Sequence, residues 1–425
     1  MKIALITDTH FGARKANVAF HEYFKKFYDM KPYLFIGEDE WKEIINTYEK
    51  EDIVEELAKA LHTYEPPIPT FTDKQTLDAL KKLKGIWYND LIIKKKWFRR
   101  NERHSDYDLK FDGEYCYIKR LNTGNNASNP FHIENRWKVD WVRTPSGYKT
   151  WQTVKGIKTI VRAFFTLEKV LTKVDLQSIR MATTLRKYVA SQFKPSVAKS
   201  FYDMFESKNI LDFSAGWGDR LAGFYACDNT KHYVGIDPNT NNHDGYKKQV
   251  EFYKKHQTFF EDEKRVDLIP EPAEDVDYSE YTNHFDTIFT SPPYFNTEKY
   301  SDEDTQSYIR YKKIDDWNKN FLHKALDKML PTLKKGGILA VNIADVFNAP
   351  INDYVEITNP MNDFLKSKGL KYRGCIGMEM TKRFNSGGAG KAKSEYFDKH
   401  LRDNTEKTEQ ENIAFGEPIW IWEKQ

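Results

Sequence analysis

Residues 209–226 read NILDFSAGWGDRLAGFYA and set the architecture that we expect for most of this chain. The β-forming run Ile210–Phe213 ends in a small-residue turn, Ser214-Ala215-Gly216-Trp217-Gly218. A helical pattern follows the turn, because Leu221, Phe224 and Tyr225 recur on one side. A strand, a glycine turn and a helix in this order are typical of the first unit of a parallel α/β sheet, where ligands bind beyond the carboxyl ends of the strands.

Strands and helices continue to alternate after this unit. A second strand, in His232–Asn239, ends at Asp237; a third spans Val266–Ile269, and a fourth spans Phe285–Thr290. This rhythm predicts a parallel sheet with helices on both faces. We therefore expect a Rossmann-like α/β domain, preceded by an α+β module in the first part of the chain.

The glycine turn and the acid after the second strand predict an adenosine-containing cofactor. Gly216 and Gly218 let the backbone approach a ligand closely, and Asp237, about 20 residues further on, is placed to accept hydrogen bonds from a ribose diol. Taken alone, Asp237 suits a helix N-cap better. The turn is neither a P-loop nor a full GxGxxG motif. In the loop PEPAEDV, Glu274 or Asp275 is a candidate contact for an adenine amino group, the alternative being a solvated acidic loop.

The segment FDTIFTSPPYFNTEKY (Phe285–Tyr300) carries the expected chemistry. Two prolines make a stiff turn after the fourth strand, Ser291-Pro292-Pro293-Tyr294, at the same sheet edge as the glycine turn. The Ser291 side chain and the Pro292 carbonyl are placed to accept the two hydrogens of an exocyclic amino group, and Tyr294 is placed to stack on a base swung out of its helix. Alone, these four residues are explained as well by a structural turn. We expect no metal, because the sequence has no His, Cys and Asp residues at ligand spacing.

Together the two turns resemble those of the DNA amino-methyltransferases, which use S-adenosylmethionine to make N4-methylcytosine or N6-methyladenine. The family's cofactor motif is similar to ILDFSAGWG, and its catalytic motif, Asp/Asn/Ser-Pro-Pro-aromatic, is similar to Ser291–Tyr294. The resemblance covers residues 190–425, in which Leu330–Val346 is similar to the fifth strand and Glu417–Lys424 to the closing strand. It implies a class I methyltransferase fold with the following cofactor-binding residues: Phe193, Pro195, Asp212, Ser214, Ala215, Gly216, Gly218, Asp237 and Glu274.

The same resemblance implies DNA as the partner and a flipped base as the substrate. Serine in the first catalytic position is more usual in the N4-cytosine members, whereas Asp or Asn is more usual in the N6-adenine members. The sequence therefore favours N4 of cytosine slightly over N6 of adenine. Similar motifs also occur in enzymes that methylate bases of RNA, so an RNA substrate is the alternative.

A second resemblance concerns the N-terminus. MKIALITDTHFGARK (Met1–Lys15) is similar to the first strand and Asp-x-His metal motif of calcineurin-like phosphoesterases, with Asp8 and His10 as two ligands. The later motifs of that family are missing, and two ligands do not hold a two-metal site. We interpret residues 1–30 as a phosphoesterase-like fragment without activity. The alternative is a metal-dependent phosphoesterase or nuclease.

Between this fragment and the methyltransferase domain we expect a helical and basic α+β module at 31–150, a candidate for DNA target recognition, and a helical connector at 151–189. Short antiparallel strands are expected within 86–150, and Asp73 is expected to cap a helix. Residues 81–120 hold 12 Lys and Arg against 6 Asp and Glu, which suits phosphates but also a solvated helix face. The candidate DNA contacts are Arg99, Arg100 and Arg103, with Trp97, Arg136 and Arg143 nearby, and Lys382, Arg383, Lys391 and Lys393 in a glycine-rich loop.

The composition fits this assignment without proving it. The 425 residues are 40% hydrophobic and 30% charged, with a net charge of +3, as in ordinary globular proteins. The three cysteines are far apart, which excludes a disulfide framework or a zinc ribbon. No apolar run approaches 18 residues, and we expect a cytoplasmic protein of unknown oligomeric state.

Overall fold

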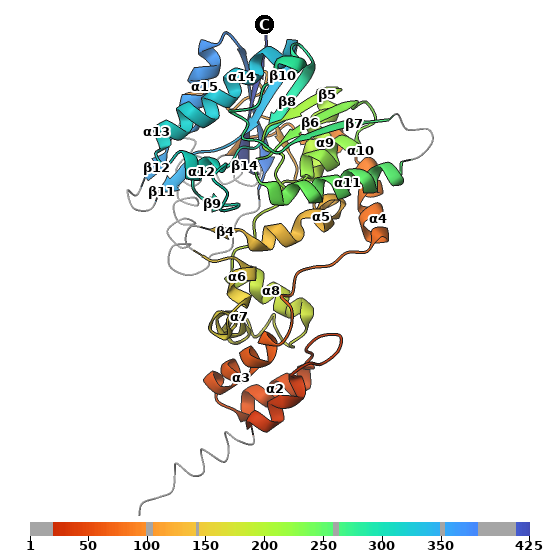
Figure 1. Cartoon of the computed structure of the whole chain (residues 1–425), viewed down its shortest axis with the longest axis vertical. Helices are drawn as coiled ribbons and strands as arrows, with labels where there is room; N and C mark the ends of the chain where they lie inside the picture. The colour runs from red at the N-terminus through yellow and green to blue at the C-terminus, as the bar shows by residue number, and fades with distance from the viewer. Residues whose placement is uncertain (1–19, 99–104, 142–143, 258–262, 349–352, 381–413) are drawn as a thin grey trace, which may run out of the picture. The chain divides into compact units, whose positions relative to one another are not determined.

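The computed structural model describes residues 20–98, 105–141, 144–257, 263–348, 353–380 and 414–425. The chain forms two compact units (Figure 1). One, the helical unit, comprises residues 1–70 and 136–190; the other, the sheet unit, comprises residues 71–135 and 191–425. Within the described ranges, every helix is too short or too polar to span a bilayer.

The helical unit is built from amphipathic helices around its own core. Helix α7 (Val154–Thr166) buries Ile157, Ile160, Val161 and Phe164, the spacing that places side chains on one helical face. Side chains cap the starts of α6, α7 and α8, since Ser146 accepts from the amide of Lys149, Thr153 from that of Gly156 and Asp175 from that of Ser178. The other elements of this unit are η1 (Lys25–Phe27), α2 (Glu38–Thr47), α3 (Lys50–His62), β4 (Asp140–Trp141), α6 (Gly147–Trp151) and α8 (Leu176–Arg186).

The sheet unit holds the alternating strands and helices that the sequence predicts. In chain order its main elements are α4 (Asp73–Lys84), β1 (Ile92–Ile93), β2 (Trp97–Phe98), β3 (Tyr117–Ile118), α5 (Asn125–Lys138, in this unit through Asn135), α9 (Pro195–Met204), β5 (Asn209–Asp212), α10 (Asp219–Ala226), β6 (His232–Ile236), α11 (His243–Lys255), β7 (Arg265–Ile269) and β8 (Phe285–Thr290). They continue with β9 (Glu298–Lys299), α12 (Ser307–Arg310), α13 (Ile314–Trp317), the π-helix η6 (Asn318–His323), α14 (Lys324–Met329), β10 (Leu333–Asn342), β11 (Val346–Asn348), β12 (Asp353–Val355), α15 (Thr358–Ser367), β13 (Lys371–Glu379) and β14 (Ala414–Glu423).

The main sheet has the strand order β1-β3-β13-β14-β10-β8-β5-β6-β7. Strands β7, β6, β5, β8 and β10 are parallel, and β14 runs antiparallel between β10 and β13. This is the Rossmann-like sheet of class I S-adenosylmethionine-dependent methyltransferases, as the sequence predicts. The chain order reverses between β5 and β8, so the carboxyl ends of these two strands form the crevice where such sheets bind ligands.

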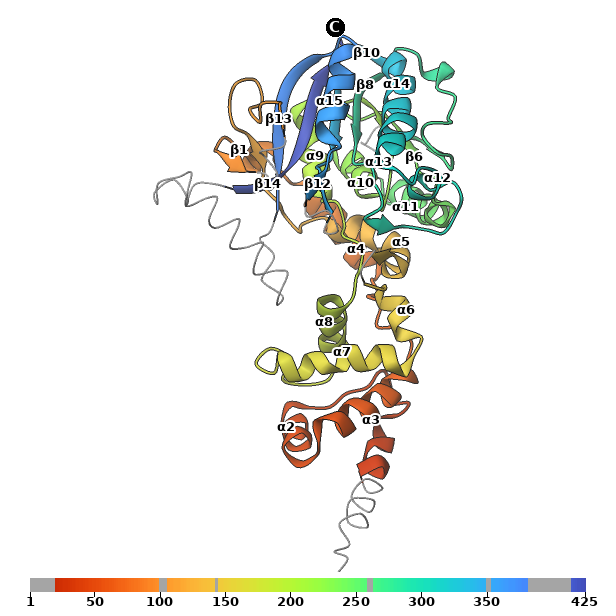
Figure 2. The ribbon, with the colours of Figure 1, turned by 90° about the vertical axis from the view of Figure 1, so that its left-hand side faces the viewer.

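Alternate residues along each strand supply two separate hydrophobic cores. Leu211, Ile288 and Leu339 pack with α14 and α15 on one face, while their neighbours Ile210 and Phe289 pack with α9 and α10 on the other. Figures 1 and 2 show these helix groups on opposite sides of the sheet. Both faces of a doubly covered parallel sheet are dry, which explains the near-continuous apolar runs in its strands.

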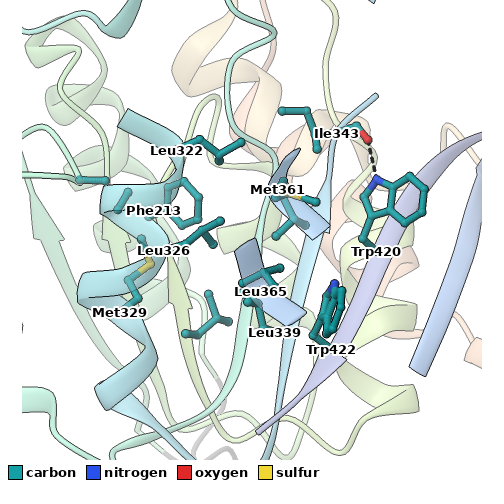
Figure 3. Packing of buried hydrophobic residues seen from close by; sticks show 14 of the residues in the cluster. Phe213, Leu322, Leu326, Met329, Leu339, Ile343, Met361, Leu365, Trp420 and Trp422 are labelled. Carbon is teal, nitrogen blue, oxygen red and sulfur yellow. Dashed lines mark hydrogen bonds between the residues drawn. The ribbon is translucent and has the colours of Figure 1, made fainter. Parts of the chain in front are cut away.

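The core under α14 and α15 extends to the closing strand β14. Leu326 and Met329 from the helix α14 face Leu339 of β10, and Trp420 and Trp422 of β14 lie beside Met361 and Leu365 of α15 (Figure 3). The indole Nε1 of Trp420 donates to the carbonyl of Ile343 at 2.9 Å. This bond satisfies a buried donor and ties β14 to the chain just beyond β10.

Three local expectations differ from the structure. Residues 71–84 belong to the sheet unit, because Leu80 and Leu83 of α4 pack into the core with α9 and α10. The boundaries between the two units therefore differ from the expected domain boundaries at 30, 150 and 189. The cap of α4 is Thr72 rather than Asp73, with a reciprocal bond to Gln75. Within residues 86–150, where short strands are expected, residues 125–138 form the helix α5 instead, and Ala127 of this helix is buried.

The hydrophobic core under α14 and α15 leads to a prediction about the free energy of unfolding. Leu326→Ala removes a fully buried side chain and should lower the free energy of unfolding by about 2–5 kcal/mol, because the transfer free energy is lost and a cavity remains. Denaturant unfolding measures the change. The control is Lys319→Ala, an exposed residue in the preceding η6, which should shift stability by less than about 0.5 kcal/mol. Equal effects of both substitutions would contradict this account of the core.

Candidate active site

A cavity of about 600 Å³ opens at the carboxyl edge of the sheet, within the sheet unit. The glycine turn after β5 and the double-proline turn after β8 both line it, as the sequence predicts. The predicted site residues in its wall are Phe193, Ser214, Ala215, Gly216, Asp237, Glu274, Ser291, Pro292, Pro293 and Tyr294. The two motifs that the sequence places 75 residues apart therefore meet at one space.

The glycine turn is held by the ends of the neighbouring elements. Gly216 has φ +59°, and its amide donates to Asp237 Oδ2 at 2.8 Å. Its carbonyl accepts from Asn242 Nδ2 at 3.1 Å and from the hydroxyl of Tyr246 at 2.5 Å. The positive φ is the conformation that glycine adopts at least cost, and these bonds fix the backbone against the cavity.

Asp237 lies at the end of β6 and is 9% exposed. Besides Gly216, it accepts from the amide of Asn239 at 2.9 Å and from Tyr246 at 3.2 Å. Burial raises the pKa of this carboxyl group despite the backbone donors. An ionised carboxylate has about four lone-pair sites, so Asp237 keeps acceptor capacity toward the cavity that it lines.

Glu274 is the acid of the PEPAEDV loop that faces the cavity. Its Oε1 accepts from Arg310 Nη1 at 2.5 Å and from Tyr311 at 3.1 Å, whereas its buried Oε2 has no hydrogen-bond partner among the described residues. Burial raises the pKa of Glu274. A buried acceptor without a donor costs free energy, so this oxygen suits a ligand amino group. The alternative, Asp275, pairs with Arg310 and Lys324 instead.

The double-proline turn is bonded at both ends to β10 and β14. Ser291 Oγ lies 3.3 Å from Asn342 Oδ1, at the end of β10. The hydroxyl of Tyr294 donates to Glu417 Oε1 of β14 at 2.5 Å. Burial and the nearby Glu417 carboxylate raise the pKa of Tyr294 well above its ordinary value, so its hydroxyl stays protonated. These contacts fix the two side chains that the sequence assigns to the substrate.

The structure does not bring three predicted cofactor residues to the cavity wall. Asp212 is fully buried, and its carboxylate accepts from Arg220 Nε at 2.7 Å and from Tyr233 at 2.7 Å. Pro195 is the buried first residue of α9, a position that suits its fixed φ. Gly218, at φ +66°, caps α10, and its small size makes room for the side chain of Gln249.

Several wall residues escape prediction from the sequence. Asp219 follows the glycine turn directly and is 1% exposed; it accepts from Gln192 Nε2 at 2.7 Å and from Ser128 Oγ. Asn342 and Glu417 come from strands far along the chain. The position of Asp219 directly after the glycine turn is a local sequence signal for its place in the cavity wall. Nothing local marks Asn342 or Glu417, because only the strand order β14-β10-β8 brings them to the double-proline turn.

The candidate DNA contacts are mostly untested by the structure. Ten of the predicted residues lie outside the described ranges: Asp8, His10, Arg99, Arg100, Arg103, Arg143, Lys382, Arg383, Lys391 and Lys393.

Two further candidates for DNA contacts are wrong. Arg136 is buried and donates to the carbonyl of Ala190 at 2.7 Å, and Trp97 is 1% exposed and packs against Gly377. Neither side chain is free to meet a nucleic acid, because each completes the core of its own unit.

Residues 285–402 match a DNA methylase family model, that of the N6- and N4-methyltransferases. The match begins at β8 and includes the double-proline turn, and it confirms the resemblance to the DNA amino-methyltransferases. No curated protein sequence matches the chain.

Solved methyltransferase structures are similar to parts of this chain at low identity and low TM-score. They include an S-adenosylmethionine-dependent O-methyltransferase of Thermotoga maritima (12% identity, 55% of this chain and 67% of that one, TM-score 0.31). The N-methyltransferase NodS of Bradyrhizobium japonicum is 10% identical over 51% of this chain and 86% of its own, with TM-score 0.29. A putative sarcosine dimethylglycine methyltransferase of Galdieria sulphuraria is 11% identical over 58% and 88%, with TM-score 0.32. At such scores, the strand order of the chain itself remains the argument for its fold.

The two glycines of the turn predict different costs for the same substitution. Both have positive φ, so alanine should cost about 1–2 kcal/mol at either position from backbone strain. At Gly216 the nearest atom to an added Cβ is the Ser214 carbonyl oxygen at 3.6 Å, whereas at Gly218 the Cβ collides with Gln249 and His132. Gly218→Ala should therefore destabilise the sheet unit more than Gly216→Ala. Chemical denaturation of both variants measures this, and the opposite order would contradict the packing described for the turn.

Proposed function

We propose that this chain transfers the methyl group of S-adenosylmethionine to an exocyclic amino group of a flipped base in DNA, with N4 of cytosine ahead of N6 of adenine. The observation that carries the proposal is the meeting of the glycine turn and the Ser291-Pro292-Pro293-Tyr294 turn at one cavity. Methyl transfer by this class of enzyme needs little from the protein beyond positioning of the two reactants. The cavity provides one set of residues for the methyl donor and another set for the amine.

The residues around the glycine turn fit S-adenosylmethionine. The remaining lone pair of Asp237 suits a ribose hydroxyl, and the unpartnered Oε2 of Glu274 suits the amino group of adenine. When bound, the cofactor supplies an electrophilic methyl group on a positively charged sulfur. Phe193 lines the same wall, and its apolar ring suits the uncharged carbon chain of the methionine part.

We assign the methionine ammonium to Asp219. The resemblance points to Asp212 at the end of β5, but the Asp212 carboxylate is occupied by the buried pair with Arg220. Asp219 lines the cavity seven residues further along, and Gln192 and Ser128 hold one of its carboxylate oxygens in place. A carboxylate next to an ammonium gains a charge-assisted hydrogen bond.

On the substrate side, the chain orients an amine for attack. Ser291 Oγ and the Pro292 carbonyl accept the two hydrogens of the amino group, which turns the nitrogen lone pair toward the methyl carbon. The nitrogen–carbon bond forms as the carbon–sulfur bond breaks, and the surplus amine proton leaves to water. Tyr294, held by Glu417, stacks on the base, and such stacking stabilises a base removed from its helix by about 1–3 kcal/mol.

The family match, to a DNA methylase model, favours DNA over RNA. Incubation with labelled S-adenosylmethionine and either duplex DNA or structured RNA, followed by digestion to nucleosides, separates the two. N4-methyldeoxycytidine is the expected product, and N6-methyldeoxyadenosine would correct the base while keeping the reaction. Label only in ribonucleosides would replace the substrate, and no methylated nucleoside from either polymer would overturn the proposal.

The catalytic turn predicts a split between turnover and cofactor affinity. Ser291→Ala and Tyr294→Ala should each lower kcat by at least about tenfold, since one hydrogen-bond acceptor or one stacking face is lost. The Kd for S-adenosylmethionine should change by less than about threefold, because neither side chain is assigned to the cofactor. Single-turnover kinetics and calorimetric titration measure the two quantities. Full activity in both variants would remove the proposed amino-group site.

For Asp219→Asn we expect the reverse pattern, in which the affinity for S-adenosylmethionine changes. The substitution keeps the size of the side chain but removes its charge, so the Kd for S-adenosylmethionine should rise by about tenfold, the loss of one charge-assisted bond. The matched control is an analogue, S-adenosyl-2-oxo-4-methylthiobutanoate, which lacks the ammonium group. Its affinity should be the same for the native protein and Asp219→Asn. A similar loss with both ligands would contradict the assignment of Asp219 to the ammonium.

A further inference from the structure

The contact between Ser291 and Asn342 has a defined direction. Asn342 is the last residue of β10, is 1% exposed and lines the cavity. Its Nδ2 donates to the carbonyl of Pro418 in β14 at 3.0 Å, while its Oδ1 faces Ser291 Oγ at 3.3 Å. The reverse orientation of the amide would set two acceptor oxygens, Asn342 Oδ1 and the Pro418 carbonyl, against each other. The backbone of β14 therefore fixes which end of the amide meets the serine.

This orientation determines where the hydroxyl proton of Ser291 lies. A carbonyl-type oxygen only accepts hydrogen bonds, so in this contact Ser291 must be the donor. Its proton then points at Asn342 Oδ1, and the lone pairs of Ser291 Oγ remain for another donor. Ser291 and Asn342 line the same cavity, so these lone pairs are available to a donor group of a ligand bound there.

We propose that Asn342 is a positioning residue that turns the Ser291 hydroxyl proton away from the substrate amine. The inference rests on the proposed function and deepens it, because it explains how a serine serves in the first position of the catalytic turn. In a catalytic turn that begins with Asn or Asp, the side chain offers an oxygen without a hydrogen. A hydroxyl is both donor and acceptor, and if its proton pointed at the amine it would bond to the nitrogen lone pair that must attack the methyl carbon.

The competing explanation is a structural one. Asn342 pairs with Ile419 in the β10–β14 ladder and bonds to Pro418, and in this explanation its loss acts only by loosening β14. That role is independent of whether residue 291 carries a hydroxyl. The positioning role requires the hydroxyl, and this difference makes the two explanations separable.

A double-mutant cycle tests the inference. Single-turnover rates are measured for the native protein, Asn342→Ala, Ser291→Ala and the double variant. Asn342→Ala should lower the rate by about tenfold, one lost orienting bond, with the Kd for S-adenosylmethionine unchanged. In the Ser291→Ala background, where no hydroxyl remains, Asn342→Ala should lower the rate by less than about twofold. Equal losses in both backgrounds would overturn the positioning role.

A second arm covers the case in which Ser291→Ala is too slow to measure. Ser291→Asn presents an acceptor oxygen without a hydroxyl, so Asn342→Ala should have little effect in that background, and a tenfold loss there would also overturn the inference. Asn362→Ala is the control for loss of a buried amide; Asn362 binds Trp422 Nε1 at 3.0 Å, away from the cavity wall. It should alter thermal unfolding without changing the rate at saturating cofactor. If the native protein methylates neither DNA nor RNA, the proposed function fails, and the premise of this inference fails with it.

Discussion

The hydrogen bond from the amide of Gly216 to the carboxylate of Asp237 is the constraint on which the site depends. It joins the turn after β5 to the end of β6 at 2.8 Å, next to the crevice between β5 and β8 where the strand order reverses. Gly216 adopts a positive φ where its amide meets this carboxylate, and the bond occupies part of a buried acid. The same carboxylate thereby holds the turn and lines the cavity, so the shape of the cavity and the integrity of the sheet edge depend on one group.

The other half of the site depends on β14, the antiparallel strand. Its insertion between β10 and β13 places Glu417 against Tyr294 and the Pro418 carbonyl against Asn342. Two prolines remove two amide donors from the double-proline turn, so the turn has few bonds of its own with which to hold its shape. Side-chain bonds from the neighbouring strands replace them. The closing strand is thus part of the site as well as the end of the fold.

The sequence predicts the parallel sheet and both turns because these depend on local patterns: β-forming runs, glycines at 216 and 218, and a double proline. It does not predict Asn342 or Glu417, because their position at the cavity depends on which strands are neighbours. No local sequence pattern gives the strand order. The error at Arg136 has the same origin. A basic side chain in a basic segment suggests a nucleic acid, but this one donates to the Ala190 carbonyl inside the protein, and burial cannot be inferred from charge.

Asp212 and Asp219 belong to one motif, but one is buried in the fold and the other lines the cavity. The buried ion pair of Asp212 with Arg220 costs desolvation on both sides, and it is tolerated because Tyr233 and the amide of Ser214 complete the bonds of the carboxylate. An acid so fully bonded has little left to offer a ligand. Asp219 lies at the N-terminus of α10, where the helix dipole favours a negative charge, and it lines the cavity. The acid that stabilises the end of β5 and the acid that lines the cavity are therefore different residues, and a motif match alone cannot tell them apart.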